Sequence, residues 1–226
     1  MSRKSPTMPR TPIAIRPRGG FTLLELSIAS VVLLIVLGAM VRALTSGSSA
    51  FEEGTSVAEA DANAQRLLDR IADELRDADF STFAPPATAP FGSDSLTFNR
   101  GRGWAAGALV HGPTQILRSV IDTGELDNGV DDNGNGLIDE RRDELGPDVA
   151  TPAQVFVIGH FVREFAVGEV QNGNDDNGNG LRDEGGLSFL SDGNSTLTVR
   201  LTIERPTRQG RSIVRTLQTT VRPRNQ

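Results

Sequence analysis

Residues 18–44 read RGGFTLLELSIASVVLLIVLGAMVRAL, and this stretch decides the fold of the chain. It contains an apolar run of 21 residues, from Phe21 to Val41, in which Glu25 is the only charged side chain. A helix needs roughly 20 apolar residues to cross the hydrocarbon core of a bilayer. The run therefore predicts a single membrane-spanning helix.

The residues before the apolar run have the character of a leader peptide. Residues 1–20 hold five basic side chains and no acidic one. The only good small-residue cleavage site, Gly19-Gly20, precedes the apolar run, whereas a secretory signal peptide is cut behind its apolar stretch. Cleavage after Gly20 would remove the charges and keep the helix. By the positive-inside rule, we expect the leader in the cytoplasm and the rest of the chain exported.

The segment G-FTLLEL resembles the signature of type IV prepilins and pseudopilins, which has glycine, phenylalanine and glutamate at the positions of Gly20, Phe21 and Glu25. The resemblance implies that prepilin peptidase cuts after Gly20 and methylates the new terminus at Phe21. It also implies that Glu25 answers the terminal amine of a neighbouring subunit. More narrowly, residues 199–225 resemble the closing strand pair of minor pilin W-like and pseudopilin J-like proteins.

Glu25 calls for a partner even without the family resemblance. A carboxylate inside a membrane helix costs about 2.5–3.5 kcal/mol on insertion scales. A free amine at Phe21 of an adjacent subunit would supply the opposite charge, and packed helices would exclude water. The alternative is a plain membrane anchor with a stray glutamate near its end.

Composition limits the functions open to the exported part. Loss of the five basic leader residues changes the net charge from −6 to −11, which argues against nucleic acid as a main partner. The chain has no cysteine, so its core, a metal or neighbouring subunits must hold the fold. No nucleophile elbow, zinc-spaced cluster or phosphate loop occurs, so we expect no enzyme activity. His111 and His160 are expected to have core or edge roles, and Trp104 is expected to pack rather than to bind a ligand.

Residues 21 to about 80 predict one long helix, with a transmembrane and assembly part (21–44) and an amphipathic second half (45–84). Gly47 and Gly54 each weaken a helix by about 1 kcal/mol relative to alanine, so a bend or fraying is expected there. An apolar stripe with 4-3-4 spacing then follows: Ala64, Leu68, Ile71 and Leu75. The charged remainder of this surface is either a contact between filament subunits or a solvated face.

Residues 85–226 predict a β-rich head. Alternation and β-branched residues predict strands at 95–100, 115–121, 154–167 (one bent strand or two), 196–204 and 211–222. Residues 206–210 would form the hairpin loop between the last two. A helix followed by consecutive antiparallel strands predicts an α+β fold, with the long helix covering one face of the sheet and two calcium loops inserted, as in pilins.

An acidic motif occurs twice: DDNGNGLIDE at residues 131–140 and DDNGNGLRDE at residues 175–184. Oxygen-bearing side chains at positions one, three and five, followed by glycine at six, are typical of the opening of an EF-hand calcium loop. We therefore expect two Ca²⁺ sites, within acidic loops 127–143 and 172–186. The expected ligands are Asp131, Asn133, Asn135, the Leu137 carbonyl, Asp139 and Glu140 in the first copy, and Asp175, Asn177, Asn179, the Leu181 carbonyl, Asp183 and Glu184 in the second.

The motif departs from an EF-hand at its end. Position twelve, a bidentate glutamate in EF-hands, is Arg142 in one copy and Gly186 in the other, so Glu140 or Asp143 would have to close the first shell. Flanking helices are missing, and the loops are more similar to the short calcium loops of dockerins or thrombospondin type 3 repeats. The alternative is two plain hairpin turns, because Asn-Gly is a strong turn signal.

These features predict a structural subunit of a type IV pilus or type II secretion filament, a minor pilin or pseudopilin. Its partners would be prepilin peptidase, other pilin subunits and the inner membrane, with a calcium-stabilised head in the periplasm. The alternative from a different class is a membrane-tethered, calcium-dependent adhesin, which would keep its leader.

Overall fold

The computed structural model describes residues 19–148, 154–207 and 210–225. The chain divides into two compact units, one ending at Ala50 and one comprising Phe51–Gln226. Most of the expected leader (1–20) lies outside the described residues; its last two residues, Gly19 and Gly20, are exposed and are not helical.

The helix α1 spans Leu23–Arg76 without interruption. The expected fraying near Gly47 and Gly54 is wrong, because residues on both sides of each glycine continue the helical hydrogen-bond ladder and outweigh the propensity cost. The amino-terminal part of α1 is apolar and long enough to cross a membrane, with a mean hydropathy of 2.5 and no buried residue in its most apolar window.

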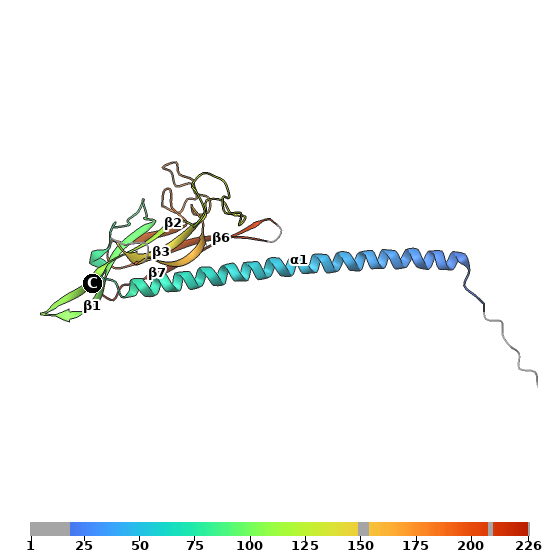
Figure 1. Cartoon of the computed structure of the whole chain (residues 1–226), viewed down its shortest axis with the longest axis horizontal. Coiled ribbons are helices and arrows are strands. Elements are labelled where there is room, and N and C mark those ends of the chain that lie inside the picture. The colour runs from blue at the N-terminus through green and yellow to red at the C-terminus, as the bar shows by residue number, and fades with distance from the viewer. Residues whose placement is uncertain (1–18, 149–153, 208–209, 226) are drawn as a thin grey trace, which may run out of the picture. The chain divides into compact units, whose positions relative to one another are not determined.

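In the unit Phe51–Gln226, the rest of α1 lies along one face of the sheet (Figure 1). The predicted apolar stripe is confirmed, since its four members are all buried. The helix ends at Arg76, earlier than expected, because the chain turns there to pair with the sheet. Ala78 bridges to Arg100, and the 3-10 turn η1 (Phe80–Thr82) follows, capped by the carboxylate of Asp79.

In the described residues the sheet has seven antiparallel strands in the order β1-β2-β3-β4-β6-β5, with β7 also paired to β6. The strands are β1 (Ser95–Ala105), β2 (Ala108–Ile121), β3 (Arg141–Pro147), β4 (Phe156–Val162), β5 (Leu187–Ser191), β6 (Leu197–Pro206) and β7 (Ser212–Val221). The expected α+β class is therefore confirmed, with helix and sheet sharing one core that includes Phe98 and Phe189.

Two strands were not expected from the sequence. The central strand β3 has the charged sequence RRDELGP, and β5 has only five residues. The expected 154–167 strand is shorter, because only residues 156–162 form β4. Gly101 and Gly103 are part of β1, and the turn to β2 falls at Ala106-Gly107. Trp104 is 74% exposed near this turn, so its expected packing role is wrong.

Gly186 lies where the end of β4 crosses the start of β5. Its N–H donates to the carbonyl of Glu164 at 3.0 Å, and its own carbonyl accepts from Thr202 at 2.6 Å. A Cβ atom at Gly186 would overlap with the backbone of Arg163, which cannot move without breaking this pairing. In the second copy, the sheet therefore leaves room only for glycine at the position where an EF-hand has glutamate.

Replacing Gly186 with alanine is expected to destabilise the head by about 2–3 kcal/mol or more, because backbone rather than a side chain must give way. Urea unfolding of the two variants Gly186→Ala and Gly185→Ala would measure this. Gly185 is the matched control, since the nearest atom to its added Cβ would be 3.4 Å away. Equal free energies of unfolding for both variants would contradict the crossing described above.

Candidate functional site

The two acidic motifs adopt the same hydrogen-bonded loop. The first aspartate of each, Asp131 or Asp175, turns its carboxylate onto the backbone of its own loop. Each carboxylate accepts three N–H groups: those of Gly134 (2.6 Å), Asn135 (3.1 Å) and Gly136 (2.8 Å), or of Gly178 (2.7 Å), Asn179 (3.1 Å) and Gly180 (2.8 Å). These bonds hold the sharp turn, in which the glycines at positions four and six have positive φ. The residues of the motif that favour a turn therefore form one in both loops.

In the first loop, three of the expected ligands converge on one point. The side-chain amides of Asn133 (2.8 Å) and Asn135 both donate to Oε1 of Glu140. Glu140 is only 2% exposed, and its Oε2 has no hydrogen-bond partner among the described residues. Leu137 lies between Asn135 and Glu140 in the sequence. Its side chain is buried and anchors the loop to the head.

The second loop repeats this convergence with one addition. The amides of Asn177 (3.3 Å) and Asn179 (2.6 Å) donate to Oε1 of Glu184, and Leu181 is buried like its counterpart. Here, however, the guanidinium of Arg200 also donates to both oxygens of Glu184, at 3.0 and 2.8 Å.

Two further acids belong to the loops and were missed from the sequence. Glu125 accepts the N–H of Asn133 at 2.8 Å, and Glu169 accepts that of Asn177 at 2.9 Å. Both acids are nearly buried. They could have been found by extending the repeat upstream at the same offset, since residues 124–140 and 168–184 agree at 13 of 17 positions.

The late aspartates of the motifs, Asp139 and Asp183, hold the entrance of each loop. Asp139 accepts the N–H groups of Asn128 (3.0 Å) and Gly129 (2.8 Å), and Asp183 makes the equivalent bonds in the second loop. Asp139 therefore points away from Glu140. Five of the six expected ligands of each copy are thus divided between an Asn-Asn-Glu group, of which only the glutamate is buried, a backbone-capping aspartate and an entrance aspartate.

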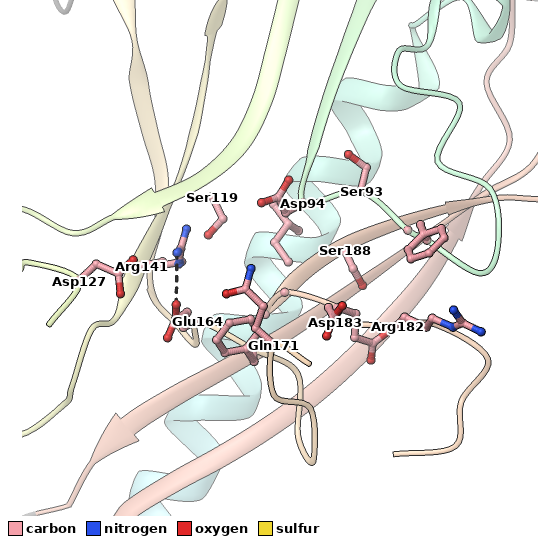
Figure 2. A pocket seen from close by; sticks show the side chains of 17 residues that line it. Ser93, Asp94, Ser119, Asp127, Arg141, Glu164, Gln171, Arg182, Asp183 and Ser188 are labelled. Atoms are coloured by element: carbon pink, nitrogen blue, oxygen red, sulfur yellow. Dashed lines mark ion pairs between the residues drawn. The ribbon is translucent and has the colours of Figure 1, made fainter. Parts of the chain in front are cut away.

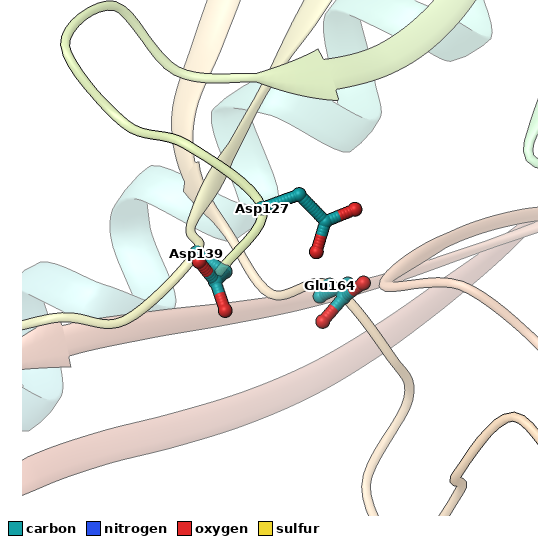
Figure 3. Close-up of side chains that lie close together, drawn as sticks. All are labelled: Asp127, Asp139 and Glu164. Atoms are coloured by element: carbon teal, nitrogen blue, oxygen red, sulfur yellow. The ribbon is translucent and has the colours of Figure 1, made fainter. Parts of the chain in front are cut away.

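Asp139 also belongs to a cluster of three carboxylates with Asp127 and Glu164 (Figure 3). One oxygen of each lies within 4.8 Å of the others. Burial, and next the negative charge of Asp127, raise the pKa of Glu164, while Arg141 at 3.6 Å opposes this rise. Carboxylates held this close favour either protons or a bound cation.

The cluster opens into a pocket of about 430 Å³ that residues of both loops line (Figure 2). Asp127 comes from the first loop, and Gln171, Arg182 and Asp183 come from the second. The two loops, 44 residues apart in sequence, are therefore neighbours in the head. Sequence spacing alone did not indicate this proximity.

Asp143 lies in β3, after the repeated motif, and no hydrogen bond among the described residues joins it to the Asn-Asn-Glu group. It is fully buried, and neither of its carboxylate oxygens has a partner there. Burial raises its pKa to about 7; the Ser119 hydroxyl, across from it on β2, opposes the rise without reaching hydrogen-bonding geometry. Glu140, rather than Asp143, is therefore the acid at the end of the first loop.

The two histidines do not lie in the core as simple packing residues. His111 contacts Asp79 at 2.7 Å and His160 contacts Asp122 at 2.8 Å, both near the surface. His111 thereby ties β2 to the cap of η1, which agrees with the expected edge role.

At the other end of the chain, Thr22 and Glu25 form a reciprocal cap at the start of α1. The N–H and hydroxyl of Thr22 each donate to Oε2 of Glu25 at 2.9 Å, and the N–H of Glu25 donates to the Thr22 hydroxyl at 3.2 Å. This is a capping box, and the spacing T-x-x-E could have predicted it. The helix therefore begins at Leu23, separated by two residues from the exposed Gly19-Gly20 pair.

Residues 15–41 match the family model described as the prokaryotic N-terminal methylation motif. The chain carries the methylation motif of the type IV pilin family. Comparisons with curated proteins and with solved structures give no match. The methylation motif covers the expected cleavage point, Glu25 and the whole apolar run, and it points to a structural subunit that is anchored in a membrane.

Asp143→Asn is expected to be more stable than the parent chain above pH 7 by up to about 4 kcal/mol. A carboxyl with a raised folded pKa stabilises the fold when protonated, and this contribution is lost as the pH rises from about 4 to about 7. The variant lacks this loss, so the difference should grow over that range.

Urea unfolding at several pH values, with calcium chelated, would measure the difference. The exposed Asp148→Asn serves as control and should follow the parent at every pH. A constant difference between Asp143→Asn and the parent from pH 4 to pH 8 would contradict the raised pKa.

Proposed function

We propose that the chain is a non-enzymatic filament subunit, a minor pilin or pseudopilin of a type IV pilus or type II secretion system. The methylation motif over residues 15–41, running into an apolar helix, carries this proposal. Prepilin peptidase would cut after Gly20, an exposed residue with no atom within 4 Å of where a Cβ would stand. The subunit would span the inner membrane once, with its head in the periplasm.

The capping box supports a role for Glu25 in assembly. Both bonds from Thr22 end on Oε2, so Oε1 can accept a further donor. After cleavage, the amine of Phe21 on a neighbouring subunit is such a donor and supplies the charge that the membrane interior lacks. The apolar side chains around Glu25, all exposed in the single chain, would then be buried first in lipid and next among helices.

The acidic loops support a second part of the proposal, that Ca²⁺ stabilises the head. Amide and carboxylate oxygens suit calcium, and each loop gathers them on a rigid, hydrogen-bonded turn. The buried Glu140 oxygen without a partner is the observation that favours a cation over a plain turn. The Asn-Asn-Glu group would swing its amide oxygens toward the ion and become part of its shell.

The alternative is a membrane-tethered, calcium-dependent adhesin. The pocket between the two loops favours it, since the pocket presents both charged and aromatic side chains to solvent, including Arg182 and Phe91. The two functions differ in processing, because a tether has no need to lose its leader.

We expect the mature protein to begin at Phe21 and to carry one N-terminal methyl group, as mass spectrometry of the membrane fraction would show. Glu25→Ala should still be cut but should enter filaments at least about tenfold less often, since tenfold corresponds to only about 1.4 kcal/mol. Glu52→Ala, at an exposed position further along α1, is the control. Retention of Met1, or normal assembly of Glu25→Ala, would exclude the filament function.

Calcium at millimolar concentration should raise the melting temperature of residues 51–226, which contain the whole buried core. An ion at ten times its dissociation constant adds about 1.4 kcal/mol, which corresponds to roughly 3–6 °C for a domain of this size. Calorimetry with calcium, with magnesium and with chelator would test this. The same melting temperature in all three, with no metal in native mass spectra, would leave the plain-turn interpretation.

A further inference from the structure

The two loops share one backbone but differ in how their buried glutamate is neutralised. Glu140 accepts two amides on Oε1, has an Oε2 without a partner in the described chain, and is 2% exposed. A buried carboxylate without a cation is unfavourable, because the ionised form loses its water and gains no opposite charge. The site of Glu140 therefore lacks one positive group.

At the equivalent point of the second loop, that positive group is present. Arg200 donates to both oxygens of Glu184, which is 4% exposed. Arg200 is held in β6 by pairing with Ser188 of β5 on one side and Gln218 of β7 on the other. The sheet therefore fixes the backbone of Arg200, and its two hydrogen bonds to Glu184 hold the guanidinium at the second site.

The second loop is also less negatively charged than the first. Residues 124–140 hold six acidic side chains and no basic one, whereas residues 168–184 hold five acidic side chains and Arg182. With Arg200 added, the second site carries −5 + 2 = −3 against −6 in the first. The carboxylate of Glu164 also lies close to Asp127 and Asp139, but Arg141 at 3.6 Å offsets its charge.

The second loop also has a buried carboxylate oxygen that could contact a cation. Oε2 of Glu169 has no partner in the described residues, whereas Oε2 of its counterpart Glu125 accepts a long bond of 3.5 Å from Asp132. The second loop therefore retains an oxygen for a weakly held ion.

We infer that the two loops are unequal cation sites. The first loop binds Ca²⁺ tightly through the group centred on Glu140, and in the second loop Arg200 replaces the metal and leaves at most weak binding. This inference rests on the proposed calcium function of the loops and assigns its stoichiometry: one firmly bound ion per chain.

Equilibrium dialysis of the full chain in detergent, with calcium first removed and then titrated, tests the inference. We expect one site at least tenfold tighter than any second site. Glu140→Gln keeps the amide contacts but removes the charge, and it should abolish the tight site. Glu184→Gln, the same change in the second loop, should leave the tight site unchanged.

Arg200→Gln should strengthen the second site by tenfold or more, so that two ions of similar affinity bind. Arg215→Gln, in the neighbouring strand β7 and paired with the exposed Asp61, is the matched control and should bind as the parent does. Circular dichroism would establish that each variant is folded; if Arg200→Gln is not, the comparison of Glu140→Gln with Glu184→Gln decides by itself.

The outcomes separate this inference from the proposed function. Two equal sites in the parent, loss of the tight site in Glu184→Gln, or no gain in a folded Arg200→Gln would overturn this inference and leave the calcium function intact. No calcium binding by the parent at millimolar concentration would overturn both.

Discussion

The structure depends on one constraint: a single helix of 54 residues must satisfy two different solvents. Its first part presents apolar side chains on every side, and none is buried within the chain. Its later part is apolar only along a stripe, which the sheet covers. Lipid or other helices must therefore cover the apolar side chains of the first part, whereas the sheet of the head covers those of the second. The first part of the helix therefore needs apolar surroundings from outside the chain, whereas the later part finds them within the head.

The sheet was predictable where its residues alternate and not where it is held by charge. The strand β6 alternates Leu197, Val199, Leu201 and Ile203, and each is buried as the pattern indicates. The strand β3 has no such pattern: its Glu144 pairs with Arg118 of β2, across the strands, and with Arg142 of β3 itself. Partners that lie on other strands leave no local trace in a sequence. The five residues of β5 are too few to show a period at all.

The candidate sites divide in the same way. The methylation motif and the repeated loop were visible because their residues are consecutive. The roles of the loop residues were not, because spacing does not tell whether an aspartate oxygen faces an ion or its own backbone. Asp131 fills the first ligand position of the motif but is occupied with three N–H groups. The partner of Glu184 is an arginine 16 residues away on another strand, and no motif includes it.

The residues that the two loops share therefore determine the shape of the turn more than the binding of an ion. All groups that shape the backbone recur: the capping aspartate, the glycines with positive φ, the entrance aspartate and the buried leucine. The four positions that differ within residues 124–140 and 168–184 include Asp127, replaced by Gln171, and Ile138, replaced by Arg182; the first change removes a negative charge from the second copy and the second adds a positive one. A conserved turn with a variable charge can be closed by either a metal ion or a guanidinium, because both satisfy the same buried carboxylate. In the second loop the guanidinium of Arg200 already satisfies the buried carboxylate of Glu184, whereas Oε2 of Glu140 in the first loop has no partner among the described residues.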